Sequence, residues 1–175
     1  MAVPESEARS AIEGFAATWR RVMTDPPGFF AAMPETGGLA APLTFLAICA
    51  AVNALGHLLL LAGVGGMIGI FVGQIVGAFV AAAAFVIVAQ HLFEGRAGFE
   101  PTFRVVAYAS APSVFFWVPV FGVLAWLYDA FLTVRGIERV HAIDVTRAVL
   151  TVVVGFAVVL LLGFTLGGRW WWVSS

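Results

Sequence analysis

The sequence predicts an all-α fold, a transmembrane bundle of about five helices preceded by an amphipathic helix. Of the 175 residues, 62% are hydrophobic and only 11% are charged, whereas charged residues make up about a quarter of ordinary soluble domains. Long stretches of the sequence lack charged residues, and several of these stretches are close in length to the ~20 residues that cross a bilayer. A soluble fold of this length would expose much of that apolar surface. Lipid is therefore the solvent that these stretches require.

The first element is an amphipathic helix from Ala8 to Met23. Its apolar side chains recur at helical spacing, and the charged ones fall on the other side. It begins either with a capping box from Ser10 to Glu13 or about a turn earlier, near Pro4. The Asp25-Pro26-Pro27-Gly28 turn ends it, because proline lacks the amide proton that a helix needs.

Residues 1–38 are expected to be a cytoplasmic segment that is not a cleaved signal peptide, since it is mixed polar and contains several acidic residues. Phe15 and Trp19 are assigned to the membrane interface. Phe29, Phe30 and Met33, which follow the turn, are interpreted as a further interfacial anchor.

Five apolar segments follow, at 40–62, 67–92, 101–118, 119–135 and 147–168, and they form a membrane domain over 39–169. Gly63 to Gly66 alone separate the first two, and the region of Pro119 separates the third and fourth, so each pair must be a tight helical hairpin. Seventeen residues reach only ~26 Å at ~1.5 Å per residue. The 101–135 pair therefore either crosses fully or forms a re-entrant hairpin.

Arginine placement predicts the topology, because cytoplasmic flanks retain positive charge. Eight of the nine arginines fall on one side of this scheme, and only Arg169 falls on the other. Arg104, Arg135 and Arg147 lie next to segment ends and are assigned to the interface. The N-terminus is thus predicted to be cytoplasmic and the C-terminus outside. Trp170 to Trp172 begin an extracytoplasmic tail at 170–175, where indole rings favour the headgroup level.

Several classes of function are disfavoured. A net charge of −1 gives no basic field for nucleic acid. No phosphate-binding loop, HExxH motif, paired zinc cysteines or GxSxG elbow is present, so we expect neither an enzyme nor a metal or other cofactor. All basic residues apart from histidine are arginine, a composition that favours a bacterial source and hence the inner membrane.

Asp129 is the sharpest polar feature, because it lies near mid-membrane if the fourth segment crosses. A central aspartate costs ~2.5–3.5 kcal/mol on insertion scales. One interpretation is a structural ion pair with Arg104 or Arg147 from a neighbouring helix. The other is a proton or cation site. Ser110 and Ser113, beside Pro112, are expected to satisfy carbonyls freed at a kink.

Asn53 and His57 are four residues apart and share a helix face. By depth Asn53 is level with Asp129, and His57 with Gln74, so these four could form a polar seam through the domain. Such groups commonly join helices by hydrogen bonds.

Small residues and prolines are assigned to helix packing. Gly69, Gly73 and Gly77 recur every four residues and clear one helix face, either for packing within the chain or for self-association. Pro112 and Pro119 are assigned to the packing of the hairpin.

Residues 103–148 resemble the Yip-domain family, named for yeast proteins that bind Ypt/Rab GTPases. The resemblance rests on several short motifs along most of the chain: Asp25-Pro26, Phe29-Phe30, Met33, Pro42-Leu43, Phe103-Arg104, Ala107-Tyr108-Ala109, Pro112, Pro119, Gly122, Tyr128, Arg135-Gly136, Val140-His141 and Arg147-Ala148. It implies a five-span domain with a cytoplasmic N-terminus.

The resemblance leads to a hypothesis of a non-enzymatic membrane protein that organises or recruits partners, with the amphipathic helix and the 135–147 loop as working surfaces. The alternative is a small transporter or channel built on the polar seam. We expect the bilayer and other membrane proteins, or a second copy, as partners. A Rab-type GTPase is not expected, because the N-terminal segment is short.

Overall fold

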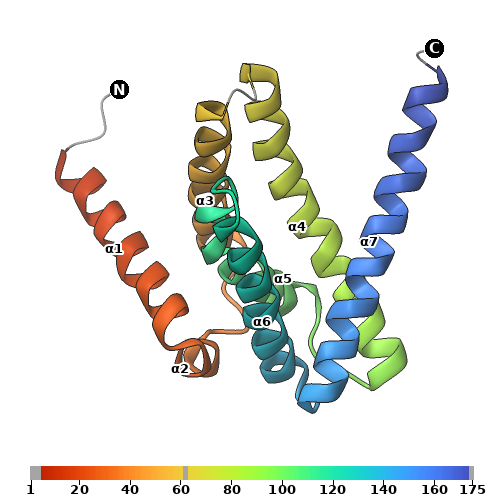
Figure 1. The fold of residues 1–175 in the computed structure, drawn as a ribbon. Helices are drawn as coiled ribbons and strands as arrows, with labels where there is room; N and C mark the ends of the chain where they lie inside the picture. Colours follow the sequence, from red (N-terminus) through yellow and green to blue (C-terminus); the bar gives the residue numbers. More distant parts are fainter. Residues whose placement is uncertain (1–4, 61–62, 174–175) are drawn as a thin grey trace.

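The computed structural model describes residues 5–60 and 63–173, and side chains within 12–60 and 63–165. All regular elements in this part of the chain are helical, and four of the five apolar segments correspond to one α-helix each (Figure 1). In chain order the elements are α1 (Glu5–Thr24), α2 (Pro26–Ala32), α3 (Ala40–Leu59), α4 (Gly63–Phe93), α5 (Phe99–Ala109), the 3-10 helix η1 (Ala111–Phe115), α6 (Phe121–His141) and α7 (Val145–Val173).

The proline turn ends α1 as predicted, but it also starts a second helix. The Asp25 carboxylate accepts a hydrogen bond from the Gly28 amide at 3.1 Å and caps α2, whose first residue is Pro26. Phe30 is 2% exposed and belongs to the hydrophobic core. The interfacial anchor expected here is therefore wrong. The capping box at Ser10 is wrong as well, because α1 already begins at Glu5.

The apolar face of α1 packs against the bundle. The Phe15 and Phe45 rings lie 5.1 Å apart between centroids, and the Trp19 indole donates a hydrogen bond to the carbonyl of Ala111 at 2.9 Å. The sequence assigned Phe15 and Trp19 to the membrane interface, but both side chains are engaged within the chain. An amphipathic pattern shows that a face is buried and does not show by what.

Three helices in the described part of the chain are long and apolar enough to cross a membrane, namely α3, α4 and α7. The predicted third segment is broken, because α5 has only 11 residues and gives way to η1 at Pro112. Proline lacks the amide needed to continue the α-helix, and the tighter 3-10 turn takes its place. The Ser110 hydroxyl donates to the Ala107 carbonyl at 2.7 Å, as expected for a kink.

The α5, η1 and α6 hairpin reaches almost as far as α3. A side chain at Gly56 would collide with the Trp117 indole at the hairpin tip, so the tip lies within one turn of Leu59, where α3 ends. The turn itself is tight, with Val120 in the left-handed region at φ 68°. Pro119 is exposed in this turn, which disagrees with its assignment to helix packing, whereas Pro112 is buried.

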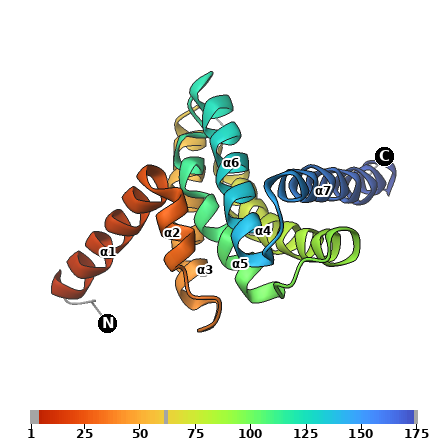
Figure 2. The same ribbon diagram turned by 90° about the horizontal axis from the view of Figure 1, so that it is seen from below.

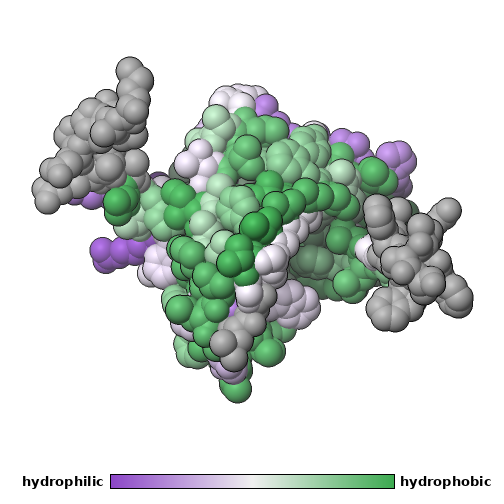
Figure 3. Space-filling view, turned by 90° about the horizontal axis from the view of Figure 1, so that it is seen from above, coloured by the Kyte–Doolittle hydropathy of each residue, from purple (hydrophilic) through white to green (hydrophobic). Residues whose placement is uncertain are grey.

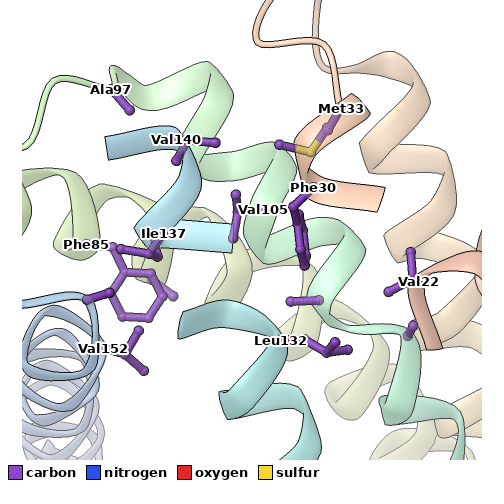
Figure 4. Packing of buried hydrophobic residues seen from close by; sticks show 14 of the residues in the cluster. Val22, Phe30, Met33, Phe85, Ala97, Val105, Leu132, Ile137, Val140 and Val152 are labelled. Carbon is purple, nitrogen blue, oxygen red and sulfur yellow. The ribbon is translucent and has the colours of Figure 1, made fainter. Parts of the chain in front are cut away.

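The hydrophobic core lies where all the helices meet near one end of the bundle (Figure 4). Val105 from α5, Ile137 from α6 and Phe85 from α4 pack there. The helices α4 and α7 cross at this level, since a side chain at Gly155 would overlap the Phe85 ring. Beyond the crossing the two helices diverge toward the opposite end of the molecule (Figure 1).

Most arginine-bearing helix ends gather at one end of the molecule, but α1 runs from this end toward the other, so that its first turns lie toward the side where α7 ends (Figure 1). Seen from below, α2, α5 and the start of α7 lie around the lower part of α6 (Figure 2). Arg104, assigned to the interface, is instead 4% exposed and donates to the Gly38 carbonyl at 2.8 Å. Arg135 and Arg147 form ion pairs with Glu138 and Asp144, at 2.7 and 3.1 Å.

Candidate functional site

Above their crossing α4 and α7 diverge, in the half of the molecule away from the arginines (Figure 1). A pocket lined by Gln74 and Gly77 of α4 and by Phe156 and Val159 of α7 opens between them, and this region is called the α4/α7 cleft below. Gly69, Gly73 and Gly77 follow one another every four residues in the part of α4 before the crossing, and Gly77 lines this pocket. Among the described residues, no atom comes within 4 Å of the place where a Cβ would stand on Gly69, Gly73 or Gly77. Gly163 on α7 is equally free. At the three positions on α4 the expected packing within the chain is therefore not seen among the described residues, and self-association stays a prediction.

A cavity of about 210 Å³ lies at the base of the α4/α7 cleft. Phe156 and Val159 of α7 and Gly77 of α4 form part of its wall, so the cavity touches both helices that border the cleft. Four polar side chains from three segments also line it: Gln74, Ser110, Asp129 and Thr133. Most of the remaining lining is apolar, so the cavity combines four polar side chains with an otherwise apolar wall.

Asp129 has neither an ion pair nor a hydrogen bond within the part of the chain that the structure describes. Arg104 is held by Gly38 and Glu100, and Arg147 by Asp144. The ion pair that the sequence suggested is therefore not formed. A carboxylate in an apolar site must be neutralised or paired. Its position in a cavity allows the partner to come from outside the chain.

Gln74 connects three segments by hydrogen bonds. Its side-chain oxygen accepts from Asn53 Nδ2 at 2.9 Å, and its Nε2 donates to Ser113 Oγ at 2.7 Å. This network joins α3, α4 and η1. Two members of the predicted seam, Asn53 and Gln74, are thus in contact, although the sequence matched Gln74 by depth with His57.

The four-residue seam is thus divided. Asp129 and Gln74 share the cavity, whereas His57 Nδ1 is 3.0 Å from the Asn53 carbonyl of its own helix. Asn53 Oδ1 is buried without a partner among the described residues. Gln74 is the link between the cavity and the network, and no continuous polar path joins all four side chains.

The roles of Ser113 and Thr133 were not predicted from the sequence. Ser113 was assigned to the proline kink, yet its hydroxyl accepts from Gln74. Thr133 lies four residues after Asp129 and hence on the same helix face, and this spacing could have identified it. Ser113 had no comparable signal, because its contact depends on the fold of the hairpin.

A second buried polar contact lies at the arginine-rich end. His141 is fully buried, and its Nε2 is 2.9 Å from the Thr102 hydroxyl. That hydroxyl donates to the Gly98 carbonyl, so the imidazole donates to Thr102 and Nδ1 carries no proton. Burial lowers the pKa of His141 to about 4. The neutral ring ties the end of α6 to the start of α5.

The end of the molecule away from the arginines is mainly hydrophobic (Figure 3). Exposed apolar side chains continue along the upper parts of α4, α6 and α7, including Val72, Leu124 and Leu160. A surface of this kind is stable in lipid and not in water. The α4/α7 cleft and its cavity therefore lie within a membrane-embedded part of the protein.

Comparison with known proteins agrees with this architecture. The family model described as Yip1 domain matches residues 20–167, which is most of the chain. No match to a curated protein or to a solved structure was found. The matched region begins within α1 and includes every helix of the bundle. The chain is a multi-pass membrane protein that belongs to the Yip1-domain family.

Proposed function

We propose that this chain is a non-enzymatic membrane protein that organises or recruits other membrane proteins by packing with them inside the bilayer. Its location is the cytoplasmic (inner) membrane, with the N-terminus in the cytoplasm and the C-terminus outside. The gathering of the arginine-bearing ends on one side of the bundle supports this orientation. The lack of catalytic motifs in the sequence supports a role in assembly.

The observation that carries the proposal is the unfilled α4/α7 cleft. Helices associate in lipid where small residues let backbones approach closely, and Gly69, Gly73 and Gly77 offer such a face with no neighbour among the described residues. Phe15 and Trp19 already make contacts within the chain, Phe15 with the Phe45 ring and Trp19 with the Ala111 carbonyl. We therefore locate the working surface in the cleft rather than on the amphipathic helix that the sequence favoured.

The test is photo-crosslinking in native membranes with a photoreactive residue in place of Gly73. Val123, which is 62% exposed on α6 outside the cleft, is the control position. We expect discrete protein adducts at position 73 that are absent at 123. Gly69→Leu should suppress them, because a bulky side chain closes the face. Adducts to lipid alone, or the same proteins at both positions, would refute the proposal.

A small transporter is the second candidate, and the shared cavity of Asp129 and Gln74 favours it. The purified protein in liposomes would then move protons or cations, and Asp129→Asn would abolish the flux. The division of the predicted seam argues for the first candidate, since His57 bonds to its own helix. No proton, Na⁺ or K⁺ flux above that of empty liposomes would remove the transporter.

A further inference from the structure

We propose that the α4/α7 cleft receives a transmembrane helix of another protein that carries a lysine or arginine near mid-membrane, and that Asp129 pairs with that basic group. The inference rests on the proposed function and names the chemistry of the partner. Its premise is geometric, because the glycine faces and the acid belong to one continuous site. Gly77 lines both the cleft face and the cavity that holds Asp129.

The first requirement is that a partner helix has room between α4 and α7. Gly73 and Gly163 lie in the diverging parts of α4 and α7, and no described atom lies within 4 Å of the position that a Cβ would take on either, so a partner helix can approach both closely. The cleft narrows toward the crossing of Phe85 and Gly155. A side chain of the incoming helix that points toward this narrow end therefore enters the cavity of Asp129.

The second requirement is that the partner helix carries a charge opposite to that of Asp129. The two arginines that the sequence suggested as partners are occupied, Arg104 by Gly38 and Glu100 and Arg147 by Asp144, and Arg135 pairs with Glu138. An unpaired carboxylate in an apolar site is costly, and an incoming cation offsets that cost far better than an apolar group does. Gln74, Ser110 and Thr133 add hydrogen-bonding groups to the same cavity. The chemistry thus favours a basic side chain over an apolar one.

The same reasoning argues against a second copy of this chain as the occupant. Residues 40–90, 105–134 and 148–168 contain no lysine and no arginine. A second copy could approach the glycine face, but its helices bring no permanently charged group to the depth of Asp129. The partner is therefore a different protein with a basic residue inside one of its spans.

The test uses the purified full chain in liposomes with synthetic transmembrane peptides. Each peptide is an alanine- and leucine-rich helix of roughly 20 residues with a glycine face, and the residue at its midpoint is lysine, leucine or glutamate. Association is measured by energy transfer between dyes on the protein and on the peptide. We expect the lysine peptide to bind about tenfold more tightly than the leucine peptide, and the glutamate peptide to bind most weakly.

Two pairs of variants assign this preference to the cleft. Asp129→Asn should reduce the affinity for the lysine peptide to that for the leucine peptide. Asp144→Asn, which removes an acid at the arginine-rich end, should leave the preference for lysine intact. Gly73→Leu should weaken the binding of both peptides. Gly14→Leu is the control and should not, because Gly14 lies on α1 and a Cβ there also has free space. Gly69→Leu serves as a second cleft variant, and circular dichroism with gel filtration checks folding.

The outcomes separate the two proposals. Equal binding of the lysine and leucine peptides, or a lysine preference that survives Asp129→Asn, overturns the basic partner, while sensitivity to Gly73→Leu still supports helix docking. If no peptide binds, or if binding ignores Gly73→Leu and Gly69→Leu, the cleft is not a helix receptor and both proposals fail. Self-association that excludes every peptide would assign the cleft to a second copy and overturn the inference.

Discussion

Replacing Gln74 with leucine tests the network that holds α3, α4 and η1 together. Gln74 makes two interhelical hydrogen bonds, at 2.9 Å with Asn53 and at 2.7 Å with Ser113. Such bonds in membranes contribute ~0.6 kcal/mol each on average and at most ~1.7 kcal/mol. Gln74→Leu removes both, so the free energy of unfolding should fall by ~1 to ~3 kcal/mol. Asn53→Leu breaks one bond and also removes a buried oxygen that has no partner, so it should cost less.

The assay is reversible unfolding in mixed micelles, with the two single variants and the double variant combined in a double-mutant cycle. The cycle should give a coupling energy between Asn53 and Gln74 of about 0.5 kcal/mol or more. Thr44→Val is the control, because Thr44 is exposed and its hydroxyl bonds only to Ala40 of its own helix. If Gln74→Leu is as stable as the original chain, or if the coupling is zero, the hydrogen bonds do not hold these helices.

Two further predictions address the hairpin tip and the arginine-rich end. Gly56→Ala should lower stability by about 1–3 kcal/mol in thermal unfolding, because its methyl group overlaps the Trp117 indole, whereas Gly14→Ala on the open face of α1 should stabilise slightly; an unchanged melting temperature for Gly56→Ala would contradict the contact. Because burial lowers the pKa of His141 from 6.5 to about 4, the unfolded chain takes up this proton first. Stability should therefore be constant above about pH 6.5 and fall by about 2 kcal/mol by pH 5, and His141→Gln should remove this part of the pH dependence measured by thermal unfolding in detergent.

Hydrophobicity and glycine or proline punctuation predicted most of the helices. The segments at 40–62, 67–92 and 147–168 correspond to α3, α4 and α7, because the length that crosses lipid is a local property of the chain. Arginine placement put the start of α5, the end of α6 and the start of α7 on one side, and these ends lie together in the structure (Figure 2). The break at Pro112 was less accessible, since the sequence indicated a kink but not a 3-10 helix that ends α5 at Ala109.

The candidate site was predicted only in part. Asp129 and Gln74 were identified from their cost in lipid, and their shared cavity agrees with that reasoning. The hydrogen bond between Asn53 and Gln74 was not predicted, because depth counted along one helix ignores tilt and the crossing of neighbours. The predicted ion pair of Asp129 with Arg104 was wrong too, because the Arg104 guanidinium instead donates to the Gly38 carbonyl, 66 residues away in the chain.

The sequence by itself determined that this chain is a helical membrane protein and where its long apolar helices lie, because hydropathy acts locally along the chain. Only the tertiary structure decided what each face meets. It turned Phe15 and Trp19 toward Phe45 and Ala111, and it left the α4 glycines facing an open cleft. A small or apolar face satisfies lipid and protein about equally, so the pattern alone cannot distinguish a packed helix from a free one.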